Sequence, residues 1–242
     1  RPSNVWTLKS NEIGTYAKTE LLKQSYTTEV TGREMFDLLG SNVIDHYTFN
    51  ISVDGETTRS ILGADGVDAY FTENNFVRSN KDGVGQTGNG VLTQVFKDGH
   101  WDGNGKWITD VTITKVNTYV GDVVSKTAAT SVRDAYITVA ARGDKYVGGN
   151  YTTDDFAMDD IVIYNYSKKT GSVGVKNVAA AETVTGTLTS YTTGDSATVG
   201  GKEYDYSYKI AREATQAAVN TDVTAVLDPY YYIDFFELTG DN

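Results

Sequence analysis

The stretch Val223–Leu238, VTAVLDPYYYIDFFEL, predicts a β-hairpin, and the rest of the chain is interpreted around it. Apolar residues alternate with other residues on both sides of a central turn, which is the period of two expected of strands. The turn at residues 228–231 (DPYY) suits a type I turn, because Asp is favoured at its first position and proline fixes φ at its second. In the second strand the alternation predicts two faces, one with Tyr232, Asp234 and Phe236 and the other with Ile233, Phe235 and Glu237. A hairpin this rich in aromatic residues needs other strands to close a core around it.

The composition of the 242-residue chain favours strands and tight turns, because it contains 17 Tyr, 24 Gly and only 2 Pro. Its formal net charge of −11 argues against nucleic acid as a partner, since a polyanion is repelled by a surface without a basic patch. No apolar run approaches the roughly 20 residues that span a bilayer. We therefore expect no membrane insertion.

The chain contains no cysteine. Cytosolic proteins usually keep some reduced thiols and secreted animal domains usually carry disulfides, so a β-rich chain without cysteine fits an extracellular bacterial surface protein best. The first four residues, RPSN, do not have the layout of a signal peptide. We expect the chain to be part of a longer protein.

We expect an all-β chain of small tandem modules, barrel-like or sandwich-like, with one short helix near residues 31–40. The helix is predicted where Thr31 can cap the first turn, Glu34 follows three residues later and Gly40 can end it. The strand signals suggest three modules: a β-rich N-terminal module with the helix at 1–108, a small β module at 109–171 and a second one at 172–242.

The two C-terminal modules look like diverged copies of one plan. Residues 119–125 (YVGDVVS) correspond to 184–190 (VTGTLTS), and the strand at 161–166 corresponds to the one at 223–227. The copies are offset by about 65 residues, the kind of period that marks a tandem repeat. Each copy has the strand content of a small barrel of about five strands, whose closure would remove exposed edges.

Further segments extend along most of the chain: 14–19 (GTYAKT), 29–34 (EVTGRE), 111–121 (VTITKVNTYVG), 159–164 (DDIVIY), 199–207 (VGGKEYDYS) and 226–233 (VLDPYYYI). In these segments the chain resembles the β-rich spacer regions of S-layer homology domain proteins, the surface proteins of Gram-positive bacteria, Firmicutes in particular. Members of that family usually have glycine where this chain has Tyr231, so a retained turn requires Tyr231 to adopt a left-handed conformation. The resemblance implies an extracellular surface-layer protein whose β modules act as spacers and contact neighbouring copies or other cell-surface proteins.

We expect no enzymatic activity and assign no catalytic residue. A nucleophilic triad needs a base beside Ser or Cys, and this chain has only two histidines, no cysteine and no Gly-x-Ser-x-Gly elbow. His46 begins a predicted strand and His100 lies in a glycine-rich turn, so both are interpreted as structural or exposed.

The same glycine-rich turn holds the best candidates for a metal site. Asp98, Asp102 and Asn104 offer oxygen ligands of the kind that Ca²⁺ prefers, and Asp110 lies nearby in sequence. Lys106 occupies the next ligand position, however, and no Glu follows to close a calcium loop. Asp-Gly and Asn-Gly are also ordinary hairpin residues. We therefore favour a plain turn without a cofactor, and keep Ca²⁺ as the alternative.

Five aromatic residues are the candidate binding residues: Trp101, Trp107, Tyr230, Tyr231 and Tyr232. One interpretation of the first four is an aromatic platform on which a sugar stacks. Aromatic residues of a tyrosine-rich β protein more often pack in the core or pair across strands. An aromatic turn on the surface also suits a protein interface, because buried aromatic anchors dominate binding energy.

The function expected first is that of a non-catalytic spacer and assembly module. The first alternative is an adhesin that binds a host glycoprotein or immunoglobulin, suggested by the irregular segment 63–90 and the tyrosines of the 230–232 turn. The second alternative is a carbohydrate-binding module that uses Trp101 and Trp107.

Overall fold

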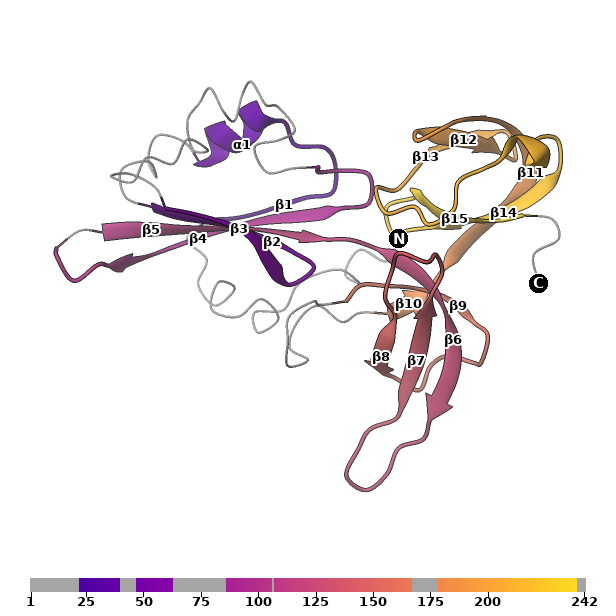
Figure 1. The fold of residues 1–242 in the computed structure, drawn as a ribbon, viewed down its shortest axis with the longest axis horizontal. Coiled ribbons are helices and arrows are strands. Elements are labelled where there is room, and N and C mark those ends of the chain that lie inside the picture. The colour runs from indigo at the N-terminus through magenta and orange to yellow at the C-terminus, as the bar shows by residue number, and fades with distance from the viewer. Residues whose placement is uncertain (1–21, 40–46, 63–85, 106, 167–177, 239–242) are drawn as a thin grey trace. The chain divides into compact units, whose positions relative to one another are not determined.

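The structure, a computed structural model, describes residues 22–39, 47–62, 86–105, 107–166 and 178–238. The chain is all-β, as the sequence predicts, and its strands form three five-stranded sheets (Figure 1). The first sheet lies in one compact unit, and the second and third sheets share another.

The first sheet consists of β1 (Leu22–Tyr26), β2 (Tyr47–Val53), β3 (Glu56–Leu62), β4 (Leu92–Trp101) and β5 (Trp107–Val116), in the order β1-β4-β5-β2-β3. β2 pairs with β5 in parallel, and the other pairs are antiparallel. From Val111 to Val116 every residue of β5 is buried, as expected of a central strand with both faces covered. The module boundary predicted from the sequence placed most of β5 in the second module. In the structure β5 pairs instead with β2 and β4, because the β4–β5 hairpin connects it directly to a strand of the first sheet.

The predicted helix is confirmed as α1 (Gly32–Leu39). The Thr31 amide donates to the Glu34 carboxylate at 3.1 Å, and the Glu34 amide donates to the Thr31 hydroxyl at 3.1 Å. This reciprocal pair is the capping box expected from the sequence. Met35 anchors the apolar face of the helix and is fully buried. No helix in the described part of the chain is long and apolar enough to cross a bilayer.

The second sheet consists of β6 (Tyr119–Thr127), β7 (Tyr136–Ala141), β8 (Gly149–Thr152), β9 (Ile161–Tyr164) and β10 (Val178–Ala180), in the order β10-β9-β6-β7-β8. Tyrosine rings fill its core, with centroids of Tyr119 and Tyr151 at 5.7 and 5.8 Å from that of Tyr164. The Tyr151 hydroxyl donates to the Asn165 carbonyl at 2.8 Å, and the Tyr164 hydroxyl to the Val147 carbonyl at 2.8 Å. Burial raises the pKa of both phenols, so they remain protonated donors.

The third sheet consists of β11 (Glu182–Thr192), β12 (Ser196–Val199), β13 (Lys202–Asp205), β14 (Asp222–Leu227) and β15 (Ile233–Glu237), in the order β13-β12-β11-β14-β15. A short 3-10 helix, η6 (Gln216–Ala218), precedes β14. The predicted hairpin is confirmed as β14–β15. Tyr206, just after β13, forms a parallel bridge with Ile233, and the Ser207 amide donates to the Ile233 carbonyl at 2.9 Å. The two edges of this sheet therefore meet, which leaves fewer unpaired backbone groups.

The second and third sheets repeat one topology. Read from β8 to β10 and from β13 to β15, both follow the same strand order, and every neighbouring pair is antiparallel. Each has a register shift at the same place, between Val123 and Ser125 in β6 and between Leu188 and Ser190 in β11. In each sheet a residue with a left-handed backbone precedes the fourth strand in chain order: Asp159 before β9 and Asn220 before β14, both with a φ of 69°. These shared irregularities support the predicted repeat, since a bulge at one position is a built feature of a sheet.

The predicted faces of the last strand are wrong at one point. Val226 pairs with Phe235 and Leu227 pairs with Ile233, so Asp234 is an extra residue that forms a bulge. A strict alternation would put Ile233 and Phe236 on opposite faces. Because the bulge shifts the phase by one residue, both belong to the same buried core cluster with no exposed surface.

Candidate functional site

The β4–β5 hairpin carries the predicted metal ligands. Asp98 and Asp110 are directly opposite each other in the register, whereas Asp102 and Asn104 lie at the exposed tip. The Asn104 amide donates to the Asp102 carboxylate at 2.6 Å, a contact typical of a plain turn. Three residues of strand, about 10 Å of rise, separate Asp98 from Trp101. The hairpin thus arranges the candidates as two separate pairs, whereas the oxygens that ligate one Ca²⁺ all lie within about 2.6 Å of it.

Within the described ranges, no group of three or more His, Cys, Asp or Glu side chains is placed to hold a metal ion. Ca²⁺ binding stays a prediction. His100 belongs to β4, where it pairs with Ile108, and not to the turn where the sequence placed it. His46 and residues 63–85 of the irregular segment lie outside the described residues.

The candidate aromatic residues fall at two places that are distant in sequence. Trp101 and Trp107 are opposite each other where β4 and β5 end, and Trp101 is 66% exposed. Tyr230, Tyr231 and Tyr232 form the β14–β15 turn.

Asp228 organises the backbone of this turn. Its Oδ1 accepts hydrogen bonds from the amides of Tyr230 at 2.8 Å and Tyr232 at 2.9 Å, and its carbonyl accepts one from Tyr231 at 3.1 Å. Tyr231 has a φ of 68°, the left-handed conformation that the resemblance implies for a retained turn.

Two carboxyl groups are buried beside the turn, since Asp228 and Asp234 are each 1% exposed. Burial first, and the nearby Asp228 second, raise the pKa of Asp234 well above its ordinary value, and a hydrogen bond with Ser207 opposes them. The folded chain therefore holds the proton of Asp234 more tightly than the unfolded chain does.

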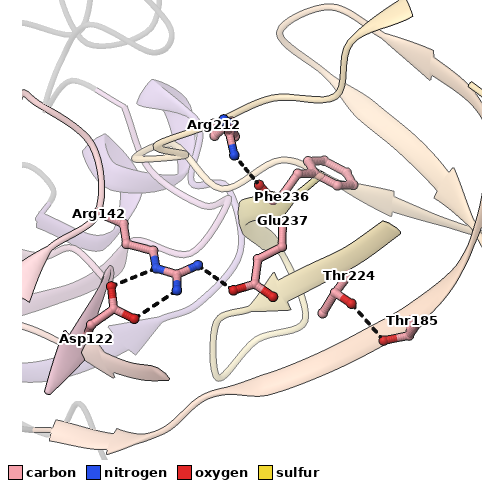
Figure 2. A network of polar contacts seen from close by, with 7 residues as sticks. All are labelled: Asp122, Arg142, Thr185, Arg212, Thr224, Phe236 and Glu237. Carbon is pink, nitrogen blue, oxygen red and sulfur yellow. Dashed lines mark hydrogen bonds and ion pairs between the residues drawn. The ribbon is translucent and has the colours of Figure 1, made fainter. Parts of the chain in front are cut away.

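A cleft of about 770 Å³ lies within the unit that contains the second and third sheets. Arg142, which follows β7 directly, lines this cleft and contacts two acidic side chains (Figure 2). The Arg142 guanidinium donates to both oxygens of Asp122, from Nε at 2.9 Å and from Nη2 at 2.8 Å. It also donates from Nη1 to Glu237 at 2.6 Å. One arginine thus joins two strands of different sheets, because Asp122 belongs to β6 and Glu237 to β15.

The planar fork of an arginine suits this arrangement, since it presents several donors in fixed directions. The hydrogen bond to Asp122 raises the pKa of Arg142, burial lowers it, and the hydrogen bond to Glu237 raises it further. The side chains of all three residues are at most 32% exposed, so solvent screens the ion pairs only in part.

Phe235 is the aromatic residue of the cleft lining. The guanidinium of Arg142 lies 4.9 Å from the centre of its ring, and that of Arg212 lies 5.5 Å from it. Arg212 also donates to the carbonyl of Phe236 at 3.5 Å (Figure 2). Both guanidinium groups therefore make cation–π contacts with the ring of Phe235, which stabilise the packing of the charged side chains.

Hydroxyl groups of β11 and β14 form the remaining wall of the cleft. The Thr185 and Thr224 hydroxyls are 2.9 Å apart (Figure 2). On the same two strands, the hydroxyl of Thr187, which does not line the cleft, donates to Asp222 at 2.9 Å. The lining residues that the structure describes include no histidine, cysteine or lysine that could act as a base beside a hydroxyl nucleophile.

Sequence reasoning missed this cleft. The partner of Arg142, Glu237, is 95 residues away in sequence, and no local pattern predicts a contact at that distance. The only signal in the sequence was Asp234, an acidic residue among the aromatic ones of the last strand, which marks the bulge that positions Phe235 and Glu237.

Comparisons with family models, with curated proteins and with solved structures found no match to this chain.

Proposed function

We propose that this chain is a structural, non-catalytic part of a bacterial cell-surface protein of the S-layer type, and that it acts as a spacer and assembly module. The observation that carries the proposal is the coupling of two repeated β modules through Arg142, which holds Asp122 of one sheet and Glu237 of the other.

A spacer needs modules that do not bend freely against each other. A flexible connection between the second and third sheets would leave their relative orientation to the linker alone. The bidentate pair with Asp122, the pair with Glu237 and the ring of Phe235 add directional contacts. Together with the shared strand order, they support a semi-rigid tandem unit that is repeated along a surface protein.

Neighbouring copies or other surface proteins are the proposed partners. The chain has a formal net charge of −11, so copies that pack side by side repel one another unless cations or complementary surfaces intervene. This charge makes assembly sensitive to Ca²⁺ and to ionic strength.

The test is light scattering and electron microscopy of the purified chain, with Ca²⁺ and with chelator, and small-angle scattering of the same samples. We expect ordered sheets or filaments with Ca²⁺, and a narrow distribution of dimensions for the dispersed chain. Arg142→Met should broaden that distribution, whereas Arg133→Met, which removes an exposed arginine from the β6–β7 turn, should not. A dispersed chain whose dimensions do not respond to Arg142→Met, and which never assembles, would contradict the proposal.

A further inference from the structure

A second, smaller cavity of about 350 Å³ lies in the third sheet, where the edge strand β13 meets the β14–β15 turn. It is lined by Lys202, Glu203, Tyr204, Asp205, Tyr231 and Tyr232. We infer that this cavity is a binding site for one sugar ring of a neutral oligosaccharide, with Tyr231 as its stacking platform. This site is separate from the Arg142 cleft and from the spacer role.

Closure of the sheet builds the cavity. β13 and the turn are about 30 residues apart in sequence and lie at opposite ends of the strand order. The bridge between Tyr206 and Ile233 and the hydrogen bond from Ser207 to Ile233 bring the two edges together. A charged edge strand and an aromatic turn thereby share one concave surface.

The backbone of Tyr231 has a conformation that is unfavourable for a bulky residue. Its φ of 68° is costly for a bulky side chain, and the sheet obtains the same turn at lower cost with glycine or asparagine. At 42% exposure its ring also contributes little to the core. Residues held in such backbone regions concentrate at binding sites, where the surrounding structure enforces them. Here the enforcing group is Asp228, which accepts hydrogen bonds from the amides on both sides of Tyr231.

The chemistry of the lining matches a polyhydroxyl ligand. Each sugar hydroxyl both donates and accepts a hydrogen bond. Glu203 and Asp205, two residues apart on β13 and both exposed, supply acceptors, and Lys202 supplies a donor. The aromatic ring of Tyr231 offers a flat apolar surface to the C–H face of the sugar ring.

The charge of the lining narrows the ligand class. Two carboxylates oppose one ammonium group, and that ammonium lies 5.1 Å from the centre of the Tyr204 ring. The net negative lining disfavours phosphorylated, sulfated and uronic-acid sugars. Neutral hexoses and N-acetylhexosamines carry no charge that the lining repels, and they make use of both its donors and its acceptors.

The first step of the test presents the full chain to an array of neutral, N-acetylated and acidic oligosaccharides. The preferred member is then titrated by calorimetry. We expect a neutral or N-acetylated oligosaccharide to bind with a dissociation constant on the order of 1 mM, as befits a single stacking residue.

Two variants of lining residues and one control variant test whether the sugar binds in this cavity. Tyr231→Asn should weaken binding about tenfold or more without lowering the melting temperature, because asparagine tolerates the left-handed conformation. Glu203→Gln should also weaken binding, since it replaces one of the four acceptor oxygens of the exposed carboxylate pair with an amide donor. Tyr208→Asn is the matched control: Tyr208 is 46% exposed and has Lys209 at 5.0 Å from its ring, but it lies outside the cavity.

Three results overturn the inference: no neutral sugar on the array binds, acidic sugars bind better than neutral ones, or Tyr231→Asn binds as well as the wild type. A loss of binding in Tyr208→Asn equal to that in Tyr231→Asn overturns it too. None of these outcomes bears on assembly, so the inference and the spacer role can fail independently.

Discussion

Substituting alanine for Gly121 or Gly186 should destabilise the second or the third sheet, respectively. The two glycines occupy the same position in the repeat, two residues before the register shift of β6 and of β11. A Cβ at Gly121 would lie 2.5 Å from the Ala140 carbonyl oxygen and 2.6 Å from Val139 Cγ1. A Cβ at Gly186 would lie 2.8 Å from Gly200 Cα. Gly121 is crowded by β7, and Gly186 by the backbone of the turn that follows β12.

The size of the effect follows from these distances. Ordinary contacts of a Cβ begin near 3.4 Å, so the neighbouring backbone must retreat by roughly 0.6 Å at Gly186 and 0.9 Å at Gly121. Over-packing of this kind costs about 1–3 kcal/mol of unfolding free energy. The backbone entropy that alanine saves in the unfolded chain offsets about 0.5–1 kcal/mol of it. We therefore expect a net loss of about 1–2 kcal/mol, larger for Gly121→Ala than for Gly186→Ala.

Native-state hydrogen exchange followed by mass spectrometry can locate the loss. Gly121→Ala should accelerate exchange in β6, β7 and β9, and Gly186→Ala in β11, β12 and β14. Gly149→Ala is the control, because a Cβ there would lie 3.7–4.0 Å from Tyr151 side-chain atoms, at ordinary contact distance. If both variants exchange like the wild type, the close approach of the neighbouring backbone at the repeated glycine is refuted.

Three further predictions concern the third sheet and the cleft. Phe236→Ala should lower the unfolding free energy by about 3–5 kcal/mol in urea titrations, because Phe236 is fully buried and packs edge-to-face on Tyr206. A loss below about 1 kcal/mol would contradict the place of Phe236 in the core. The contribution of Asp234 to the unfolding free energy should be complete below about pH 4 and disappear as the pH rises through the raised pKa of Asp234. Melting temperatures of Asp234→Asn measured across pH should lack that decline. A variant whose melting temperature depends on pH as that of the wild type does would argue against a buried acid. Arg142→Met should lower the unfolding free energy by about 1–2 kcal/mol at low salt, and by less at high salt, in thermal unfolding. An equal loss in Arg133→Met would show that the ion pairs of Arg142 contribute no more than an exposed arginine does.

Local interactions explain which features could be predicted from the sequence. The capping box of α1 involves residues three apart, and the turn of the last hairpin involves Asp228 and the next four residues. Strand alternation has the same short range, so the all-β class and the β14–β15 hairpin were predictable. The repeat was predictable as well, because Gly121 and Gly186 recur in similar sequence surroundings.

Other features needed the tertiary structure. The parallel pairing of β2 with β5 joins residues 62 positions apart, such as Tyr47 and Thr109, and no alternation pattern specifies a partner strand. The bulge at Asp234 changes the faces of the last strand, because packing Ile233 and Phe236 into one core outweighs regular pairing. The predicted Ca²⁺ ligands lie close together in sequence, but only the strand register shows that Asp98 pairs with Asp110 while Asp102 and Asn104 lie at the tip of the hairpin.

The sequence by itself determined the all-β class, the capped helix and the turn chemistry of the last hairpin, since each depends on contacts between near neighbours. Only the tertiary structure decided which carboxylates meet Arg142 and which edges close over the cavity beside Tyr231. The physical reason is that these contacts form between residues about 20 to 95 positions apart. Their geometry arises from sheet twist, bulges and core packing acting together.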